Sequence, residues 1–278
     1  MNIDKIIVNN QLVSFFKIDN AGDKCLLFLH GWRSQKEVWQ PIINKLQVSN
    51  NQLSFVSLDL LGFGASSIPQ KPMKVGDYAE IVRGFIEKLD LKNIVIIGHS
   101  FGGRIGIKLA AKHPELISKL VLVDAAGFVT KGFKRTFFKF MAKLVKPFFG
   151  FSFTQGLRKK IYQFIGADDY LATPGLQKTF VNVVNEDLSE EIKKISCPTL
   201  IIWGEDDKET PVEFGQRMYN LISAKGGSAP GGQDSIPSSD GIAQSNDRAK
   251  FITLPGSGHF SFLDKPEEFA EKIIKFIE

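Results

Sequence analysis

The residue of this chain best placed to do chemistry is a serine held between two glycines. Ser100 lies in the pattern Gly-x-Ser-x-Gly. The apolar run 93–97 precedes the pattern and predicts a buried strand, and residues 104–112 predict a helix after it. A strand that turns sharply into a helix around such glycines lifts the serine hydroxyl clear of the sheet, where a substrate can reach it. The sequence therefore predicts a nucleophile at Ser100, whereas the motif without this context would indicate only a tight turn.

A serine hydroxyl needs a base, normally a histidine that an acid orients. The chain has 4 histidines. His259 follows Gly-Ser-Gly in a loop between a predicted strand and a predicted helix, where glycines allow close approach to the serine. We predict that His259 is the base. For the others we expect different roles: His99 projects away from the site, His30 shapes a loop and His113 ends a helix.

The acid that orients the base is expected between the serine and the histidine in the chain. Asp207 lies just past the predicted strand 198–204, and Asp124 also ends a predicted strand. We favour Asp207, with Asp124 as the alternative, and interpret Glu205 and Asp206 as loop charges. The acid would fix the imidazole tautomer and stabilise the imidazolium as it forms.

The negative charge that develops on the substrate oxygen needs two fixed N–H donors. Phe101 directly follows the serine, at the start of the predicted helix. Trp32 follows His30 and Gly31 in the loop after the apolar run 25–29. We predict that the backbone N–H groups of Trp32 and Phe101 form this oxyanion hole.

The elements that must position these residues alternate between strand and helix. Residues 5–19 predict an antiparallel hairpin, and five later apolar runs predict strands of a mostly parallel sheet with helices on both faces. The chain closes with a predicted helix, strand and helix. The strands are predicted at 25–29, 53–58, 93–97, 120–124, 198–204 and 251–254, and the helices at 36–46, 77–89, 104–112, 213–222 and 266–277.

Residues 125–197 interrupt the alternation and predict a helical cap between two core parts, 1–124 and 198–278. Ligands of open α/β sheets bind at the carboxyl ends of the strands, which such a cap would cover. Residues 131–149 are rich in Phe and Lys and could also form a basic helix that lies on a membrane. We favour a cap helix that roofs an apolar substrate pocket. The predicted pocket residues are Phe133, Phe137, Phe138, Phe140 and Met141, and the other helical pieces fall at 156–165, 176–184 and 188–195.

Residues 226–248 are dominated by Gly, Ser, Pro, Asp and Gln. Such a segment buries too little apolar surface to offset the entropy cost of ordering it. We interpret it as a flexible polar insert within the core that the chemistry does not need. A binding loop flanked by lysines is the alternative.

Composition excludes several classes of protein. The net charge is +5, with 35 basic and 30 acidic residues interspersed, and no basic run predicts nucleic-acid binding. Cys25 and Cys197 lie far apart and form neither a disulfide framework nor a metal-ligand pattern. No apolar signal region or long apolar stretch occurs, so we expect a cytoplasmic protein without membrane contact, monomeric or homodimeric.

Five stretches together carry a resemblance to a known family. On these motifs the chain resembles the α/β-hydrolase superfamily over nearly its whole length outside 226–248. The resemblance implies a mostly parallel, eight-stranded sheet with flanking helices and a helical cap, no metal or organic cofactor, and the triad Ser100, Asp207 and His259. The stretches are Leu29-His30-Gly31-Trp32, Asp59-Leu60-Leu61-Gly62-Phe63-Gly64-x-Ser66, Gly98-His99-Ser100-Phe101-Gly102-Gly103, Pro198-Thr199-Leu200-Ile201-Ile202-Trp203-Gly204-x-x-Asp207-x-x-x-Pro211 and Gly256-x-Gly258-His259.

Within that superfamily the chain looks most like small esterases and meta-cleavage-product C–C hydrolases. The C–C hydrolases usually carry Trp after the catalytic histidine, where this chain has Phe260. Haloalkane dehalogenases use an Asp nucleophile, which Ser100 excludes. We expect a serine hydrolase that cleaves carboxylic esters with apolar acyl or aryl groups through an acyl-enzyme on Ser100. The alternatives are C–C, lactone or amide cleavage or perhydrolysis with the same triad, and a non-catalytic ligand-binding relative.

Overall fold

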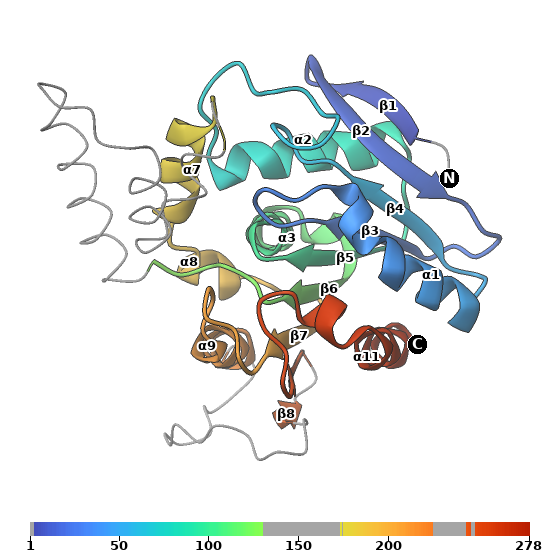
Figure 1. Cartoon of the computed structure of the whole chain (residues 1–278), viewed down its shortest axis with the longest axis vertical. Helices are drawn as coiled ribbons and strands as arrows, with labels where there is room; N and C mark the ends of the chain where they lie inside the picture. Colours follow the sequence, from blue (N-terminus) through green and yellow to red (C-terminus); the bar gives the residue numbers. More distant parts are fainter. Residues whose placement is uncertain (1–2, 130–172, 174, 225–242, 246–247) are drawn as a thin grey trace, which may run out of the picture.

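A computed structural model describes residues 3–129, 173, 175–224, 243–245 and 248–278 (Figure 1). The Phe-rich stretch 131–149 and the predicted pocket residues Phe133, Phe137, Phe138, Phe140 and Met141 lie outside the described residues. So do the predicted helix at 156–165 and most of the polar segment 226–248.

Within the described residues the fold is built on one sheet of nine strands in the order β1-β2-β4-β3-β5-β6-β7-β9-β8. The pairs from β4 to β9 are parallel, and the hairpin β1–β2, its junction with β4 and the β9–β8 pair are antiparallel. The predicted mostly parallel sheet and its opening hairpin are thus confirmed. The strands are β1 Ile3–Val8, β2 Gln11–Ile18, β3 Cys25–Leu29, β4 Ser54–Leu58, β5 Ile94–His99, β6 Ile117–Val123, β7 Thr199–Gly204, β8 Ala243–Ser245 and β9 Ala249–Leu254.

The sheet has one strand more than the eight that the resemblance implies. The additional strand, β8, comes from the segment 226–248, for which we predicted no regular structure, and it pairs with β9 at the sheet edge. A backbone ladder on an edge strand needs no apolar side chains, so the polar composition carried no signal for it.

The central strands are buried on both faces, which explains why they appear as unbroken apolar runs. Successive side chains of β3 enter different cores: Leu27 belongs to the cluster that contains residues of α2, α3 and α9, and Phe28 belongs to the cluster that contains residues of α1, α10 and α11. Helices therefore cover both faces of the sheet (Figure 1). These helices are α1 Gln40–Ser49, α2 Val75–Lys88, α3 Phe101–Lys112, α7 Gln177–Val184, α8 Ser189–Ile192, α9 Val212–Ser223, α10 Ser261–Asp264 and α11 Pro266–Ile277, with short 3-10 turns at Lys36–Trp39 and Pro114–Leu116.

The described ends of the predicted cap segment are joined to each other beside α3. The N–H of Leu188 donates to the oxygen of Gly127 at 2.9 Å. The guanidinium of Arg104, on α3, donates to the backbone oxygen of Glu186 at 2.7 Å. Helices α7 and α8 lie where the sequence predicts helices. The segment that leaves the core after β6 and the segment that returns to β7 are therefore both held against the helix that begins beside Ser100.

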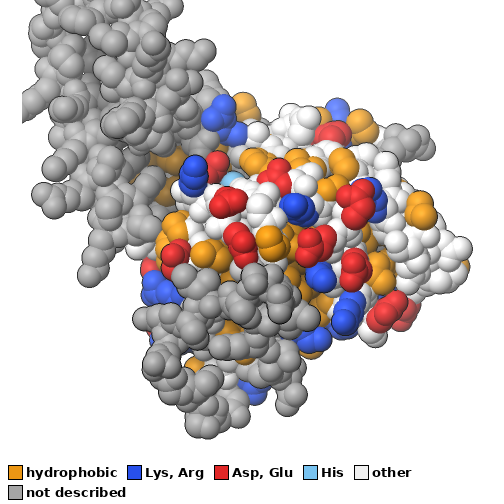
Figure 2. Space-filling view, turned by 60° about the horizontal axis from the view of Figure 1, so that its bottom comes forward, with side chains coloured by type: hydrophobic (Ala, Val, Ile, Leu, Met, Phe, Trp, Pro, Cys, Tyr) orange, Lys and Arg blue, Asp and Glu red, His pale blue; other side chains and the backbone are white. Residues whose placement is uncertain are grey.

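Two observations concern the molecular surface. In Figure 2 basic and acidic side chains are interspersed over the visible described face and do not form a patch of one sign. No helix within the described ranges is both long and apolar enough to cross a membrane.

Candidate active site

The turn between β5 and α3 holds Ser100 in a strained conformation. Its φ is 49° and its ψ is −107°, a region that a residue with a side chain rarely adopts. The neighbouring glycines are required by close backbone contacts: a Cβ on Gly98 would lie 2.6 Å from the oxygen of Gly102, and one on Gly102 would lie 2.2 Å from the oxygen of Leu29. The motif is therefore a sharp strand-to-helix turn, as the sequence predicts.

The backbone of Ser100 is fixed while its hydroxyl is left available. Its N–H donates to the oxygen of Val123 at 3.0 Å, and its carbonyl accepts from Ala126 at 3.2 Å. The side chain is half-buried. Within the described residues, no group forms a hydrogen bond with the Ser100 hydroxyl. The oxygen is thus positioned by the main chain and free to meet a substrate.

Asp207 and His259 meet at the same sheet edge. Nδ1 of His259 lies 2.8 Å from Oδ2 of Asp207. The carboxylate also accepts from the Thr210 hydroxyl at 2.7 Å and from the N–H of Glu209 at 2.8 Å. Burial raises the pKa of Asp207, but the hydrogen bond and charge of His259, with the bonds from Thr210, hold it below its ordinary value. The Asp207 carboxylate is therefore ionised. A proton on Nδ1 of His259 would donate to it and would leave a lone pair on Nε2.

The protonation of His259 is set by opposing effects. Burial lowers the pKa of its imidazole. The hydrogen bond and charge of Asp207, and then the charges of Glu209 and Asp124, outweigh burial and raise the pKa above its ordinary value. The imidazolium that would form on proton transfer is therefore stabilised by surrounding carboxylates.

The loop after β3 passes very close to Ser100. A Cβ on Gly31 would lie 3.4 Å from Cβ of Ser100. The ring of Trp32 packs on that of Phe101, with centroids 5.2 Å apart. Nε2 of His30 accepts from the N–H of Leu60 at 3.0 Å, which is the loop-shaping role expected for it. Because Phe101 begins α3, its N–H has no acceptor within the helix. The oxyanion hole formed by the N–H groups of Trp32 and Phe101 stays a prediction.

Comparison with known proteins gives the family of this chain. The sequence pattern of the Alpha/beta hydrolase family matches residues 26–272. The chain belongs to this family. It is 24% identical to the uncharacterized hydrolase YugF of Bacillus subtilis over 99% of this chain and 98% of that protein.

Two further members illustrate the range of this α/β hydrolase family. One is the 2-hydroxy-6-oxo-6-(2'-aminophenyl)hexa-2,4-dienoic acid hydrolase of Metapseudomonas resinovorans, 24% identical over 91% of this chain and 83% of that one. The other is the solved esterase of Exiguobacterium antarcticum, with a TM-score of 0.70, 21% identity and 98% of both chains covered. The family and the fold are thereby established.

Asp124, the alternative acid, is engaged elsewhere in this α/β hydrolase. Its Oδ1 accepts from the N–H of Gly204 at 2.7 Å, and its Oδ2 accepts from the hydroxyl of Ser261 at 2.6 Å. It is fully buried, and burial raises its pKa to about 7. Asp124 therefore ties the end of β7, which leads to Asp207, to the residues that follow His259.

His99 takes a position that we did not predict. Its Nε2 lies 2.7 Å from the backbone oxygen of His259, and the two ring centroids are 4.8 Å apart. Burial lowers the pKa of His99 to about 3, so the ring is neutral and Nε2–H donates to that oxygen. We expected the His99 side chain to project away from the site because it neighbours Ser100 at the turn, whereas it contacts the backbone of His259. Its place at the end of the strand that leads to Ser100 was the signal that could have found it.

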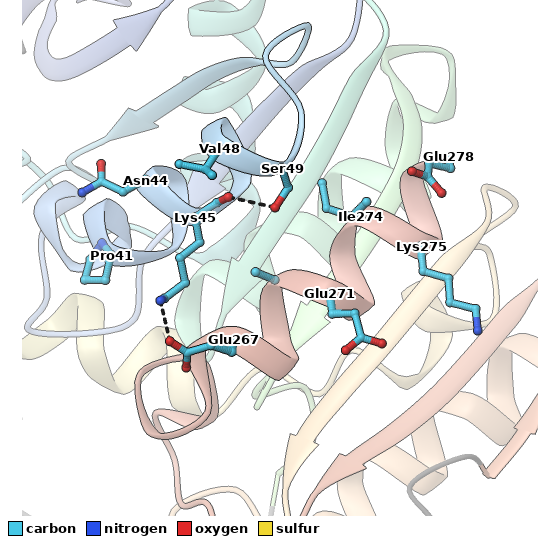
Figure 3. A pocket seen from close by; sticks show the side chains of 11 residues that line it. Pro41, Asn44, Lys45, Val48, Ser49, Glu267, Glu271, Ile274, Lys275 and Glu278 are labelled. Atoms are coloured by element: carbon cyan, nitrogen blue, oxygen red, sulfur yellow. Dashed lines mark hydrogen bonds and ion pairs between the residues drawn. The ribbon is translucent and has the colours of Figure 1, made fainter.

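Two other features lie apart from this site. A shallow groove of about 990 Å³ runs between α1 and α11, and Figure 3 shows Lys45 and Glu267 pairing across it at 2.6 Å. None of the candidate site residues lines this groove. Within the described residues, no group of three or more His, Cys, Asp or Glu side chains is placed to hold a metal ion.

Proposed function

We propose that this hydrolase cleaves carboxylic esters through an acyl-enzyme on Ser100. The observation that carries the proposal is the 2.8 Å pair of Asp207 and His259 at the sheet edge where the strained Ser100 presents an unpaired hydroxyl. A nucleophile, a base and an ionised acid at one place are the parts that acyl transfer requires.

The reaction follows from these groups. The hydroxyl oxygen of Ser100 attacks the ester carbonyl carbon while its proton passes to Nε2 of His259. The N–H groups of Trp32 and Phe101 stabilise the oxyanion, and Nε2 returns the proton to the departing alkoxide. Water, deprotonated by the same imidazole, then attacks the acyl-enzyme and releases the carboxylic acid and free Ser100.

An aromatic cluster beside Ser100 supports a preference for apolar acyl or aryl groups. The ring of Trp32 contacts Phe63, Phe101 and Phe180 at centroid distances of 4.9, 5.2 and 5.2 Å. Such walls bind apolar groups through burial and edge-to-face contacts. Phe180 lies on α7, so the returning end of the segment 125–197 contributes to this cluster.

A second candidate uses the same triad to cleave a C–C bond. It is supported by the relative from Metapseudomonas resinovorans, which is named for such a substrate. The two candidates differ in substrate, so a panel of neutral 4-nitrophenyl esters and a vinylogous diketone acid separates them.

The test of the proposal is Ser100→Ala with 4-nitrophenyl acetate and butyrate. We expect kcat to fall by at least about 10⁴-fold, as losses of catalytic serines do. Ser49→Ala, on the surface helix α1, is the matched control and should keep wild-type turnover. A fluorophosphonate probe should label the wild type and not Ser100→Ala. Turnover by Ser100→Ala at the wild-type rate would refute the proposal.

A further inference from the structure

A carboxylate that the triad does not need lies against the reacting side of the base. Oε2 of Glu209 is 3.4 Å from Nε2 of His259. The backbone of Glu209 is fixed, because its N–H donates to Oδ1 of Asp207 at 2.8 Å. His259 thus has a carboxylate on each ring nitrogen, with the buried Asp207 at Nδ1 and Glu209 at Nε2.

The two carboxylates differ in what surrounds them. Asp207 is buried and its oxygens are occupied by His259, Thr210 and backbone N–H groups. The side chain of Glu209 is 68% exposed, and it makes no ion pair with Lys or Arg in the part of the chain that the structure describes. Its charge is therefore not neutralised by a described neighbour and acts on whatever approaches Nε2.

Nε2 is the atom that exchanges a proton with the nucleophile and the leaving group, so a substrate must place its scissile bond beside it. A charged group on the substrate two or three bonds from that carbonyl then falls within several ångströms of the Glu209 carboxylate. Like charges at that distance disfavour binding, and unlike charges favour it.

We propose that Glu209 is a specificity-determining residue that selects against substrates with a carboxylate near the scissile bond and favours neutral or cationic ones. The inference rests on the proposed ester hydrolysis at Ser100 and narrows its substrate class. It also bears on the two candidate reactions, because a carboxylate beside Nε2 disfavours an acidic substrate.

The size of the effect follows from Coulomb's law. Two unit charges about 5 Å apart in a water-like medium change an equilibrium by about fourfold, and by more where the dielectric constant is lower. Changing a substrate from anionic to cationic doubles that free energy, which gives a selectivity ratio of about 16-fold. Because Glu209 is exposed, salt should screen the ratio.

The test uses three 4-nitrophenyl esters of similar acyl length: butyrate, hemisuccinate and 4-(trimethylammonio)butyrate. In the wild type we expect kcat/KM, normalised to butyrate, to be lowest for hemisuccinate and highest for the cationic ester. Glu209→Gln should reduce the cationic-to-anionic ratio by at least about tenfold, and Glu209→Lys should invert the order. Glu213→Gln removes one negative charge from the first turn of α9 and is the matched control, which should keep the wild-type ratio.

The outcome is separable from that of the proposed function. If the wild type hydrolyses no ester, ester hydrolysis is refuted. The role of Glu209 can then still be tested by the binding of the three corresponding amides, measured through the imidazole resonances of His259. Equal cationic-to-anionic ratios in the wild type, Glu209→Gln and Glu213→Gln would overturn the inference. A wild-type ratio that does not fall when NaCl rises from 20 to 500 mM would overturn it too. An equal order of amide binding in those three proteins would overturn it as well.

Discussion

Replacing His99 tests how the base is held in place. The Nε2–H of His99, whose ring is buried, donates to the backbone oxygen of His259. His99→Leu keeps most of the volume and removes the donor. A buried carbonyl that loses its partner costs about 1–3 kcal/mol, and we expect a loss of unfolding free energy in that range.

The effect on activity should exceed the effect on folding. The oxygen that loses its partner belongs to the base itself, so the Gly256–His259 loop can shift relative to Ser100. A displacement of about 1 Å between reacting groups can cost about 100-fold in rate. We therefore expect kcat of His99→Leu to fall by about 10- to 100-fold, with a smaller change in KM. His99→Gln, whose amide can donate to the same oxygen, should recover most of the loss.

The assay is the pH profile of kcat and kcat/KM on 4-nitrophenyl butyrate for the wild type, His99→Leu and His99→Gln. Urea unfolding of the same proteins shows whether the folded fraction at assay temperature is unchanged. Wild-type kcat in His99→Leu would refute the positioning role. Equal losses in His99→Leu and His99→Gln would refute it too, because they would show that ring packing, and not the hydrogen bond, holds the loop.

Three further predictions concern the proposed acid, the proposed base and a buried ion pair. Asp207→Asn should lower kcat by about 10⁴-fold at neutral pH. In the wild type, kcat/KM should rise with pH through a pKa above the ordinary histidine value of about 6.5, because His259 must be neutral to act and its pKa is raised; a limb below 6.5 would contradict this. Lys36→Met leaves the buried carboxylate of Asp59, 2.8 Å from Nζ, without its cation and should cost about 3–5 kcal/mol in urea unfolding. A loss below about 1 kcal/mol would show that backbone donors alone stabilise that carboxylate.

The fold was predictable where local chemistry leaves few choices. The glycines at 98 and 102 are fixed by backbone atoms that leave no room for a Cβ, so their spacing identifies the turn at Ser100 from the sequence alone. The central strands were predictable because burial on both faces demands an unbroken apolar run. Strand β8 was not predictable, because it is defined by its backbone pairing with β9 and not by a pattern of side chains.

The order of the candidate site residues along the chain was predictable, and the residues that hold them in place were not. Asp207 and His259 could be chosen because the acid and base must follow strands and come after the serine. The roles of His99 and Glu209 depend on which way a side chain projects from a turn, and one sequence carries no periodic signal for that. The sequence correctly places Asp124 at the end of β6. That place suits either the acid that orients the base or a residue that joins two loops. Only the distances to Gly204 and Ser261 distinguish them.

The contacts that hold the candidate triad also indicate where its specificity arises. Asp124 joins the acid loop to the base loop, and His99 joins the base loop to the strand that carries Ser100. Asp124 and His99 are buried at the ends of strands, so we expect them to position the reacting atoms. Glu209 is attached to the same acid loop but faces solvent. A change at Glu209 can therefore alter which substrates react while leaving the geometry of the triad intact, and this separation makes the charge test on three matched esters decisive.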